Sequence, residues 1–319
     1  MRTPPTMCGT PGTVRDARAR TWVILLAGGE GTRLRGAWVG GELIDRPKQF
    51  CRFGRNTSLL ASTIDRAGAI ARRETIVPTV LAAHASWWRP DLYRLPHGNV
   101  VVQPRQRGTG VAILHALIHV LRCDDQPIVV VLPTDHGVDD EAPLLAALHR
   151  AIEQAAGTNR DLVLIGVTPE HAEAQYGWIL PGGPAGRSVR RVRSFVEKPS
   201  RTVAAALMEQ GGLWNSLIFA ASGRRLLELF WRSVPRLVLA YLEAMPLEGW
   251  TEDALAAFYA TAPACDFSRD VLERCHDDLD VVSMEPCGWT DLGTPGRVAA
   301  WMMRSPNGRA ARWHEEVPV

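Results

Sequence analysis

The sequence is poor in lysine. Of its 36 lysine and arginine side chains only two are lysines, Lys48 and Lys198, so arginine supplies almost every cation. A guanidinium is planar and an ammonium is compact, and the two are not interchangeable where geometry or size matters. The two lysines are either leftovers without meaning or positions that require a small cation, and their neighbours must decide.

An excess of charge of either sign is also missing. Lys+Arg total 36 and Asp+Glu total 34, which gives a formal net charge of +2. This balance excludes a strongly basic nucleic-acid binder and an acidic tail protein. We interpret the arginines between Arg187 and Arg193 as a solvated strand face or a rim for an anionic substrate, and we expect no nucleic-acid partner.

Long apolar runs and paired cysteines are absent as well. No run approaches the roughly 20 apolar residues of a membrane span, and residues 1–20 contain no apolar core of a secretory signal. The six cysteines are scattered without a CxxC spacing, which argues against a zinc ribbon or a disulfide framework. We therefore expect a cytoplasmic chain without membrane contact, preceded by a disordered tail over 1–20.

Short apolar runs alternate with amphipathic segments after residue 20, which predicts buried strands separated by helices. The predicted strands of the first half are 22–26, 75–81, 99–102, 128–132 and 162–167, and the predicted helices are 58–71, 108–122 and 141–156. This pattern indicates an α/β fold: an open, mostly parallel, Rossmann-like sheet flanked by helices. Ligands of such sheets bind outside the carboxyl ends of the strands.

The second half is less regular. Predicted strands are 176–180, 189–196, 213–220 and 281–285, and predicted helices are a block at 222–260, interrupted by Pro235 and Pro246, and a segment at 295–303. No linker is evident, so we predict one domain over 21–305. It comprises a first half at about 21–170 and a smaller, mixed, substrate-side lobe at about 171–305, followed by a C-terminal tail at 306–319.

A glycine-rich turn, LAGGEGTRL at 26–34, follows the first predicted strand. Glycines let the backbone approach a phosphate chain, and successive N–H groups can form an anion nest. Arg33 can add a charge-assisted grip. The dinucleotide fingerprint would require glycine at Leu34, which disfavours a nicotinamide-dependent enzyme. Taken alone, the loop could equally be a tight strand-to-loop turn.

The motif RPKQF at 46–50 makes the interpretation specific, because AGGxGTRL followed by PKQF resembles the sugar-1-phosphate nucleotidyltransferases, especially the mannose-1-phosphate guanylyltransferase branch. The resemblance implies a GT-A-like sheet whose first half binds the nucleotide and whose second half binds the sugar. It implies that Arg33 and Lys48 hold the phosphates of a nucleoside triphosphate. The loop residues that would wrap this triphosphate are Gly28, Gly29, Gly31 and Thr32. Segment 35–45 is longer than in the family, which predicts a differently shaped loop.

Two further motifs belong to the nucleotide half. QPRQRGTG at 103–110 resembles the family's base-reading segment, which implies that Gln103, Gly108 and Thr109 bind the nucleotide, although alone it could be a simple helix start. PTDH at 133–136 resembles the family's PADH motif, and its Asp135 would bind Mg²⁺. Oxygen ligands suit a Mg²⁺ that is shared with substrate phosphates.

The sugar half carries three matches to family motifs. YGWI at 176–179 implies that Gly177 faces the hexose, and FVEKP at 195–199 implies that Glu197 bonds sugar hydroxyls while Lys198 holds the sugar-1-phosphate. LWNS at 213–216 implies that Asn215 contacts the sugar. Leu217 stands where the family usually has glycine, which leaves the local backbone shape open.

WTDLGT at 289–294 resembles the family's WxDxGT motif and implies that Asp291 is the second Mg²⁺ ligand. The segment 266–270 matches a family stretch more loosely, and we give it a supporting role. His115 and His119 stand four residues apart without the glutamate of a zinc motif, so we interpret them as helix-face histidines.

The motifs follow the family's order over about 21–300. The implied reaction is an in-line attack of a sugar-1-phosphate oxygen on the α-phosphorus of an NTP, with catalysis by positioning and by charge neutralisation through Mg²⁺, Arg33, Lys48 and Lys198. GTP and mannose-1-phosphate are the expected small-molecule substrates. The alternatives are a uridylyl- or thymidylyltransferase acting on glucose-1-phosphate, and a non-catalytic paralogue that binds nucleotide sugars. The sequence leaves the oligomeric state open, and a homodimer is one possibility.

Overall fold

The computed structural model describes residues 20–39, 42–158, 161–184, 186–244 and 251–304. The predicted tails at 1–20 and 306–319 fall outside these ranges, apart from Arg20. Within the described ranges, no helix has the length and apolar character needed to cross a bilayer.

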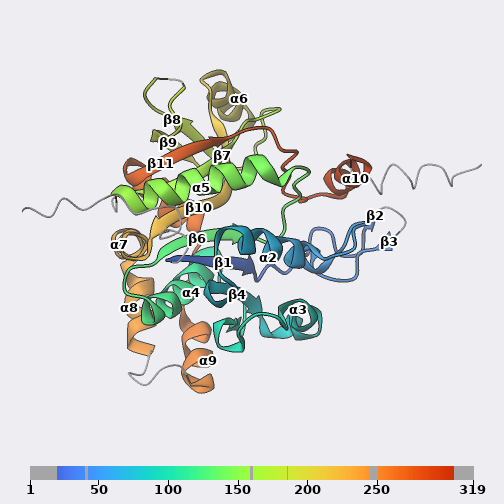
Figure 1. The fold of residues 1–319 in the computed structure, drawn as a ribbon, viewed down its shortest axis with the longest axis vertical. Helices are drawn as coiled ribbons and strands as arrows, with labels where there is room; N and C mark the ends of the chain where they lie inside the picture. Colours follow the sequence, from blue (N-terminus) through green and yellow to red (C-terminus); the bar gives the residue numbers. More distant parts are fainter. Residues whose placement is uncertain (1–19, 40–41, 159–160, 185, 245–250, 305–319) are drawn as a thin grey trace, which may run out of the picture.

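One large sheet runs through the molecule (Figure 1), with the strand order β5-β4-β1-β6-β10-β7-β11-β9-β8. Its strands are β1 (Thr21–Ala27), β4 (Ile76–Leu81), β5 (Val101–Gln103), β6 (Ile128–Pro133), β7 (Leu162–Val167), β8 (Trp178–Pro181), β9 (Arg190–Val196), β10 (Leu213–Ser222) and β11 (Leu279–Met284).

The direction of the strands differs between the two halves of the sheet. Strands β5, β4, β1 and β6 are parallel to one another, and β7 is parallel to β11. Strand β10 is antiparallel to both β6 and β7, and β8 and β9 add further antiparallel pairs. The predicted α/β fold is confirmed, with its parallel strands gathered in the first half and a mixed region in the second.

Alternate side chains of the strands supply two apolar cores, one on each face of the sheet. Val23 and Leu25 of β1 belong to one core, and Ile24 belongs to the other, as the two-residue period of a strand requires. The helices over the first face are α2 (Leu59–Ile70), α3 (Ala85–Leu92), α5 (Glu141–Thr158) and α6 (Arg201–Glu209). Those over the second are α4 (Thr109–Cys123), α7 (Gly223–Ser233), α8 (Pro235–Ala244) and α9 (Glu252–Thr261).

A third, smaller cluster lies beside the segment that follows β1. Within the segment 35–45, β2 (Trp38–Val39) pairs antiparallel with β3 (Glu42–Leu43), beside α10 (Pro295–Arg304) in Figure 1. Val39 and Ile44 are buried in one cluster with Trp301 of α10. The end of the described chain therefore packs against the loop that leaves the first strand.

Candidate active site

A cavity of about 240 Å³ lies where the parallel strands of the first half end. Because these strands run in one direction, their carboxyl ends meet at one edge of the sheet, where open α/β sheets bind their ligands. The predicted residues that line this cavity are Gly28, Gly29, Arg33, Lys48, Gln103, Gly108, Thr109, Asp135 and Asp291. Residues from separate motifs, far apart in the sequence, therefore converge on one hollow.

The glycine-rich loop is held against the PKQF motif. The Gln49 amide donates hydrogen bonds to the carbonyl oxygens of Ala27 and Gly29, at 3.0 and 2.7 Å. Gly31 has φ +65°, and a Cβ there would lie 2.7 Å from the Cα of Pro47. The loop needs glycine at this position both for its backbone conformation and for its close approach to the second motif.

The start of α4 rests on the segment 265–267, which overlaps the loosely matching stretch 266–270. The Cys265 carbonyl accepts a hydrogen bond from the Gly110 N–H at 2.9 Å, and the Phe267 N–H donates to the Thr109 hydroxyl at 2.9 Å. Gly108 has φ +91°, and a Cβ there would lie 2.2 Å from the Cys265 oxygen. This segment, 265–267, therefore fixes the backbone that borders the cavity.

Lys48 contacts both residues that were predicted to bind a metal, one through its carboxylate and the other through its backbone. Its ammonium lies 3.1 Å from an Asp135 oxygen and donates to the backbone carbonyl of Asp291 at 2.6 Å. Burial alone would raise the pKa of Asp135, but the positive charge of Lys48 and its hydrogen bond outweigh this effect, and the pKa lies below its usual value. Asp135 is therefore ionised at neutral pH.

The carboxylate of Asp291 is held on one oxygen. Its Oδ1 accepts hydrogen bonds from the Tyr176 hydroxyl at 2.8 Å, from Arg297 at 2.9 Å and from the Gly293 N–H at 3.1 Å. Burial would raise the pKa of Asp291, yet these donors and the charge of Lys48 hold it below the usual value. Asp291 is also ionised at neutral pH.

The donor set fits Mg²⁺, which prefers carboxylate and phosphate oxygens. Asp135 and Asp291 line the same cavity, and in the described part of the chain no group of three or more His, Cys, Asp or Glu side chains could hold a metal ion. A cation here would take its remaining ligands from substrate or water. His136 is neutral at neutral pH, because burial lowers its pKa to about 4, and its Nδ1 accepts a hydrogen bond from the Trp289 indole at 3.2 Å.

The predicted sugar-side residues form a neighbouring cluster rather than part of the cavity lining. The Asn215 N–H donates to the Gly177 carbonyl at 2.8 Å, and a Cβ on Gly177 would lie 2.5 Å from a Glu197 oxygen. The Lys198 ammonium lies 3.3 Å from the other Glu197 oxygen, and its side chain is 50% exposed. Burial raises the pKa of Glu197 although Lys198 opposes this shift.

The structure shows the backbone shape at Leu217, which stands where the family usually has glycine. It has φ +57°, the left-handed region that glycine adopts readily, and lies at a register shift of β10 between Asn215 and Phe219. Its side chain lines the cavity. The backbone therefore keeps a glycine-like conformation while the leucine takes up space in the site.

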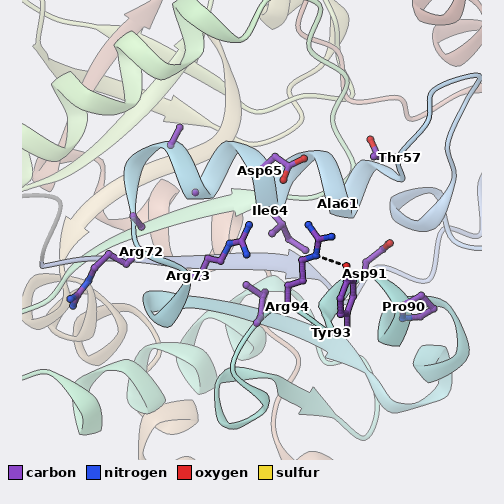
Figure 2. A pocket seen from close by; sticks show the side chains of 14 residues that line it. Thr57, Ala61, Ile64, Asp65, Arg72, Arg73, Pro90, Asp91, Tyr93 and Arg94 are labelled. Atoms are coloured by element: carbon purple, nitrogen blue, oxygen red, sulfur yellow. Dashed lines mark hydrogen bonds between the residues drawn. The ribbon is translucent and has the colours of Figure 1, made fainter.

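A cavity of about 690 Å³ between α2 and α3 is larger, but no predicted site residue lines it. Figure 2 shows Arg73 and Arg94 directed toward α2 on either side of Ile64. Neither the glycine-rich loop nor the two metal-side carboxylates reach this cavity, so size alone does not identify the active site.

Sequence reasoning missed three residues that shape the site. Gln49 and Tyr176 lie inside quoted motifs, but no role was assigned to their side chains. Arg297 belongs to no motif, and its contact with Asp291 depends on how α10 packs. Tyr176 could have been found as a polar side chain next to Gly177 and Gln49 as one next to Lys48, whereas no signal in the sequence identified Arg297.

The structure is an α/β protein with a cavity at the carboxyl ends of its parallel strands, and comparison with known families specifies its class. Residues 22–303 match the model of the family described as Nucleotidyl transferase, and the chain belongs to this family.

Among its relatives, the chain is 31% identical over 280 residues to the xanthan biosynthesis protein XanB of Xanthomonas campestris pv. campestris (strain B100), covering 85% of this chain and 57% of that one. It is 29% identical over 284 residues to a mannose-1-phosphate guanylyltransferase of Escherichia coli, covering 85% and 59%. The chain thus spans less than two thirds of the length of these relatives.

Solved structures agree with the fold. A Thermus thermophilus structure described as mannose-1-phosphate geranyltransferase aligns with a TM-score of 0.74 and 30% identity, over 86% of this chain and 76% of that one. A UDP-glucose pyrophosphorylase complexed with UDP-glucose aligns with a TM-score of 0.56 over 88% of this chain and 97% of that one, but at 12% identity, so it supports the fold alone.

Proposed function

We propose that the chain is a sugar-1-phosphate nucleotidyltransferase that joins GTP to mannose-1-phosphate. The observation that carries the proposal is the convergence of the glycine-rich loop, Lys48, Asp135 and Asp291 on one cavity. The names of the Escherichia coli and Thermus thermophilus relatives support the choice of mannose-1-phosphate, and that of the former supports guanylyl transfer.

In the proposed reaction, an oxygen of the sugar-1-phosphate attacks the α-phosphorus of the NTP. The bond between the α-phosphorus and the bridging oxygen breaks, and pyrophosphate leaves with that oxygen. The backbone at Gly28 and Gly29 would approach the phosphate chain, and Arg33 and Lys48 would offset its negative charge. Mg²⁺, held by Asp135 and Asp291, would supply further charge neutralisation when bound.

On the sugar side, Glu197 and Asn215 would accept and donate hydrogen bonds to hexose hydroxyls, and Lys198 would hold the sugar phosphate. No protein nucleophile is required, because the sugar phosphate attacks directly. The protein contributes position and charge, which are the main sources of catalysis in phosphoryl-type transfers.

The test is a pyrophosphate-release panel that pairs GTP, UTP, dTTP and ATP with mannose-1-phosphate and glucose-1-phosphate, with Mg²⁺ present. The proposal expects the highest kcat/KM for GTP with mannose-1-phosphate. Turnover restricted to UTP or dTTP with glucose-1-phosphate would replace it with the uridylyl or thymidylyl alternative. Binding of GDP-mannose without pyrophosphate release from any pair would favour a non-catalytic regulator.

The metal assignment has its own test in the same assay. Asp135→Asn and Asp291→Asn each keep the size of the side chain but remove the charge that a cation needs. Both variants should remain folded, as judged by far-UV circular dichroism, and lose turnover. Near-normal rates at saturating Mg²⁺ would contradict the role of these carboxylates.

A further inference from the structure

Two side chains from distant parts of the chain meet on one oxygen of Asp291. We propose that Tyr176 and Arg297 are positioning residues, which hold Oδ1 of Asp291 and leave its second oxygen available to the divalent cation. The proposal rests on the proposed function, because that function gives Asp291 its metal. It goes beyond it by assigning two residues that touch neither substrate nor metal.

The hydrogen bonds determine how the carboxylate is oriented. The Tyr176 hydroxyl and Arg297 donate to Oδ1 at 2.8 and 2.9 Å, and the Gly293 N–H donates to the same atom at 3.1 Å. No hydrogen bond from the described residues falls on Oδ2. Three donors on one oxygen fix the rotation of the group, which is how second-layer partners orient metal ligands.

The Tyr176 ring is itself held in place. It packs edge-on against Trp214 and Trp289, with ring centroids 5.1 and 5.8 Å apart, and the Arg297 guanidinium lies 4.9 Å from its centroid. Removing only the hydroxyl would leave these ring contacts intact. The hydroxyl can therefore be tested separately from the packing of the ring.

Arg297 bridges two carboxylates. One end of its guanidinium bonds Asp291, and the other forms an ion pair with Glu173, whose backbone carbonyl accepts the Trp178 indole N–H at 2.8 Å. The Arg297 side chain is 23% exposed, so it is partly shielded from water. Its planar fork suits two acceptors at once, which a lysine would not reproduce.

The arrangement connects the two substrate sides of the site. Glu173 and Tyr176 lie in the segment that leads directly into Gly177, the predicted hexose contact, and into β8. The carboxylate on the metal side is therefore oriented by the segment that borders the sugar. A displacement of this segment would be transmitted to Asp291 through two hydrogen bonds.

Charge and position predict opposite results, which makes the proposal testable without activity. If Arg297 acted only as a charge near the metal site, its removal would strengthen cation binding, because one repulsive charge is lost. If it positions Asp291, its removal weakens cation binding despite that gain. Losing such an outer partner typically costs roughly 10- to 100-fold in metal affinity or activity.

The experiment titrates Mn²⁺ alone into the full chain and follows the free ion by electron paramagnetic resonance. Tyr176→Phe and Arg297→Ala should each weaken Mn²⁺ binding by about 10-fold. Arg232→Ala removes an exposed arginine of α7 that pairs with Asp278, and serves as a matched control with wild-type affinity. Unchanged or tighter Mn²⁺ binding in Arg297→Ala, or no Mn²⁺ binding by the wild type, would overturn the proposal.

The double variant Tyr176→Phe/Arg297→Ala sharpens the result. Because both residues hold the same oxygen, their effects on Mn²⁺ affinity should be less than additive, whereas independent structural damage would add. The pyrophosphate panel separates this proposal from the proposed function. If the wild type transfers no nucleotide but the variants bind Mn²⁺ more weakly, only the proposed function is contradicted. If the wild type is active but the variants bind Mn²⁺ as tightly as the wild type, only the positioning role is contradicted.

Discussion

Lys48 and Lys198 occupy different surroundings although both lie in predicted phosphate-binding motifs. The Lys48 side chain is 14% exposed and touches Asp135 and the Asp291 carbonyl, so little room remains for a larger head group. Lys198 is half exposed and contacts Glu197. Every other Lys or Arg position of the chain is an arginine. We attribute the lysine at position 48 to the small space around it, and the lysine at position 198 to its expected role toward the sugar phosphate.

Replacing either lysine by arginine should impair catalysis while keeping the charge. Lys48→Arg and Lys198→Arg are each expected to lower kcat more than ~10-fold, or about 1.4 kcal/mol in the barrier, because a planar guanidinium cannot take the place of a compact ammonium. Steady-state pyrophosphate release measures the effect. Wild-type rates in either variant would mean that catalysis does not require a lysine at that position.

Leu217 allows a test of backbone strain. Leu217→Ile keeps the number of atoms but places a β-branched residue at φ +57°, where such residues are rare outliers. We expect the free energy of unfolding in urea to fall by about 1–2 kcal/mol. Leu26→Ile is the matched control, because Leu26 lines the same cavity from a regular strand and should change by less than about 1 kcal/mol. Equal losses in the two variants would argue against strain at Leu217.

At the scale of elements, the start of α4 shows how packing supports a binding segment. Its N-terminal residues are fixed by a backbone hydrogen bond to Cys265 and by one from the Phe267 N–H to the Thr109 hydroxyl. The segment 265–267 approaches so closely that position 108 has no room for a side chain. The stretch 266–270, which matches the family only loosely, overlaps this support at 266–267.

Gly108→Ala should therefore lower the free energy of unfolding by more than backbone strain alone would. Gly186 has nearly the same φ, +90° against +91°, but a Cβ there would meet no atom within 4 Å. Gly186→Ala is expected to cost about 1–2 kcal/mol from strain, and Gly108→Ala clearly more, with a raised KM for the nucleotide. Urea unfolding and initial rates give both values, and equal effects would contradict the close contact with Cys265.

The elements of the first half could be predicted because continuous apolar runs and helical periodicity are strong local signals. Strand 162–167 and helix 59–70 lie within two residues of the predicted bounds. Helix α3 was missed because it is short and contains Pro90, and Pro235 begins α8 instead of merely interrupting a helix. The pairing of β2 with β3 lies in one apolar cluster with α10, a contact that no local pattern reveals.

At the scale of the whole molecule, distant segments assemble the site through the order of the strands. Asp135 and Asp291 are brought together because β6 ends at the cavity and the chain returns beyond β11. The motifs could be found in the sequence because each carries local glycine, lysine or carboxylate chemistry. Their mutual contacts, such as that of Arg297 with Asp291, arise only from the tertiary fold.

The buried core also predicts a dependence of stability on pH. His115 is 5% exposed and bonds the Tyr259 hydroxyl at 3.0 Å, and burial lowers its pKa from 6.5 to about 4. In the unfolded chain His115 is protonated below about pH 6.5, whereas in the native protein it stays neutral down to about pH 4. The free energy of unfolding therefore falls as pH decreases from about 6.5 to about 4, by up to about 3 kcal/mol. Urea unfolding should therefore show a steeper decline for the wild type than for His115→Asn, and parallel declines would contradict a neutral buried histidine.

We propose above that this chain transfers a guanylyl group to mannose-1-phosphate. Its most direct test is ³¹P nuclear magnetic resonance of the purified protein with GTP, mannose-1-phosphate and Mg²⁺. We expect GDP-mannose and pyrophosphate to appear in equal amounts as both substrates disappear, and Asp135→Asn to abolish both signals. Unchanged substrates in the wild type, or GTP hydrolysis without GDP-mannose, would contradict it.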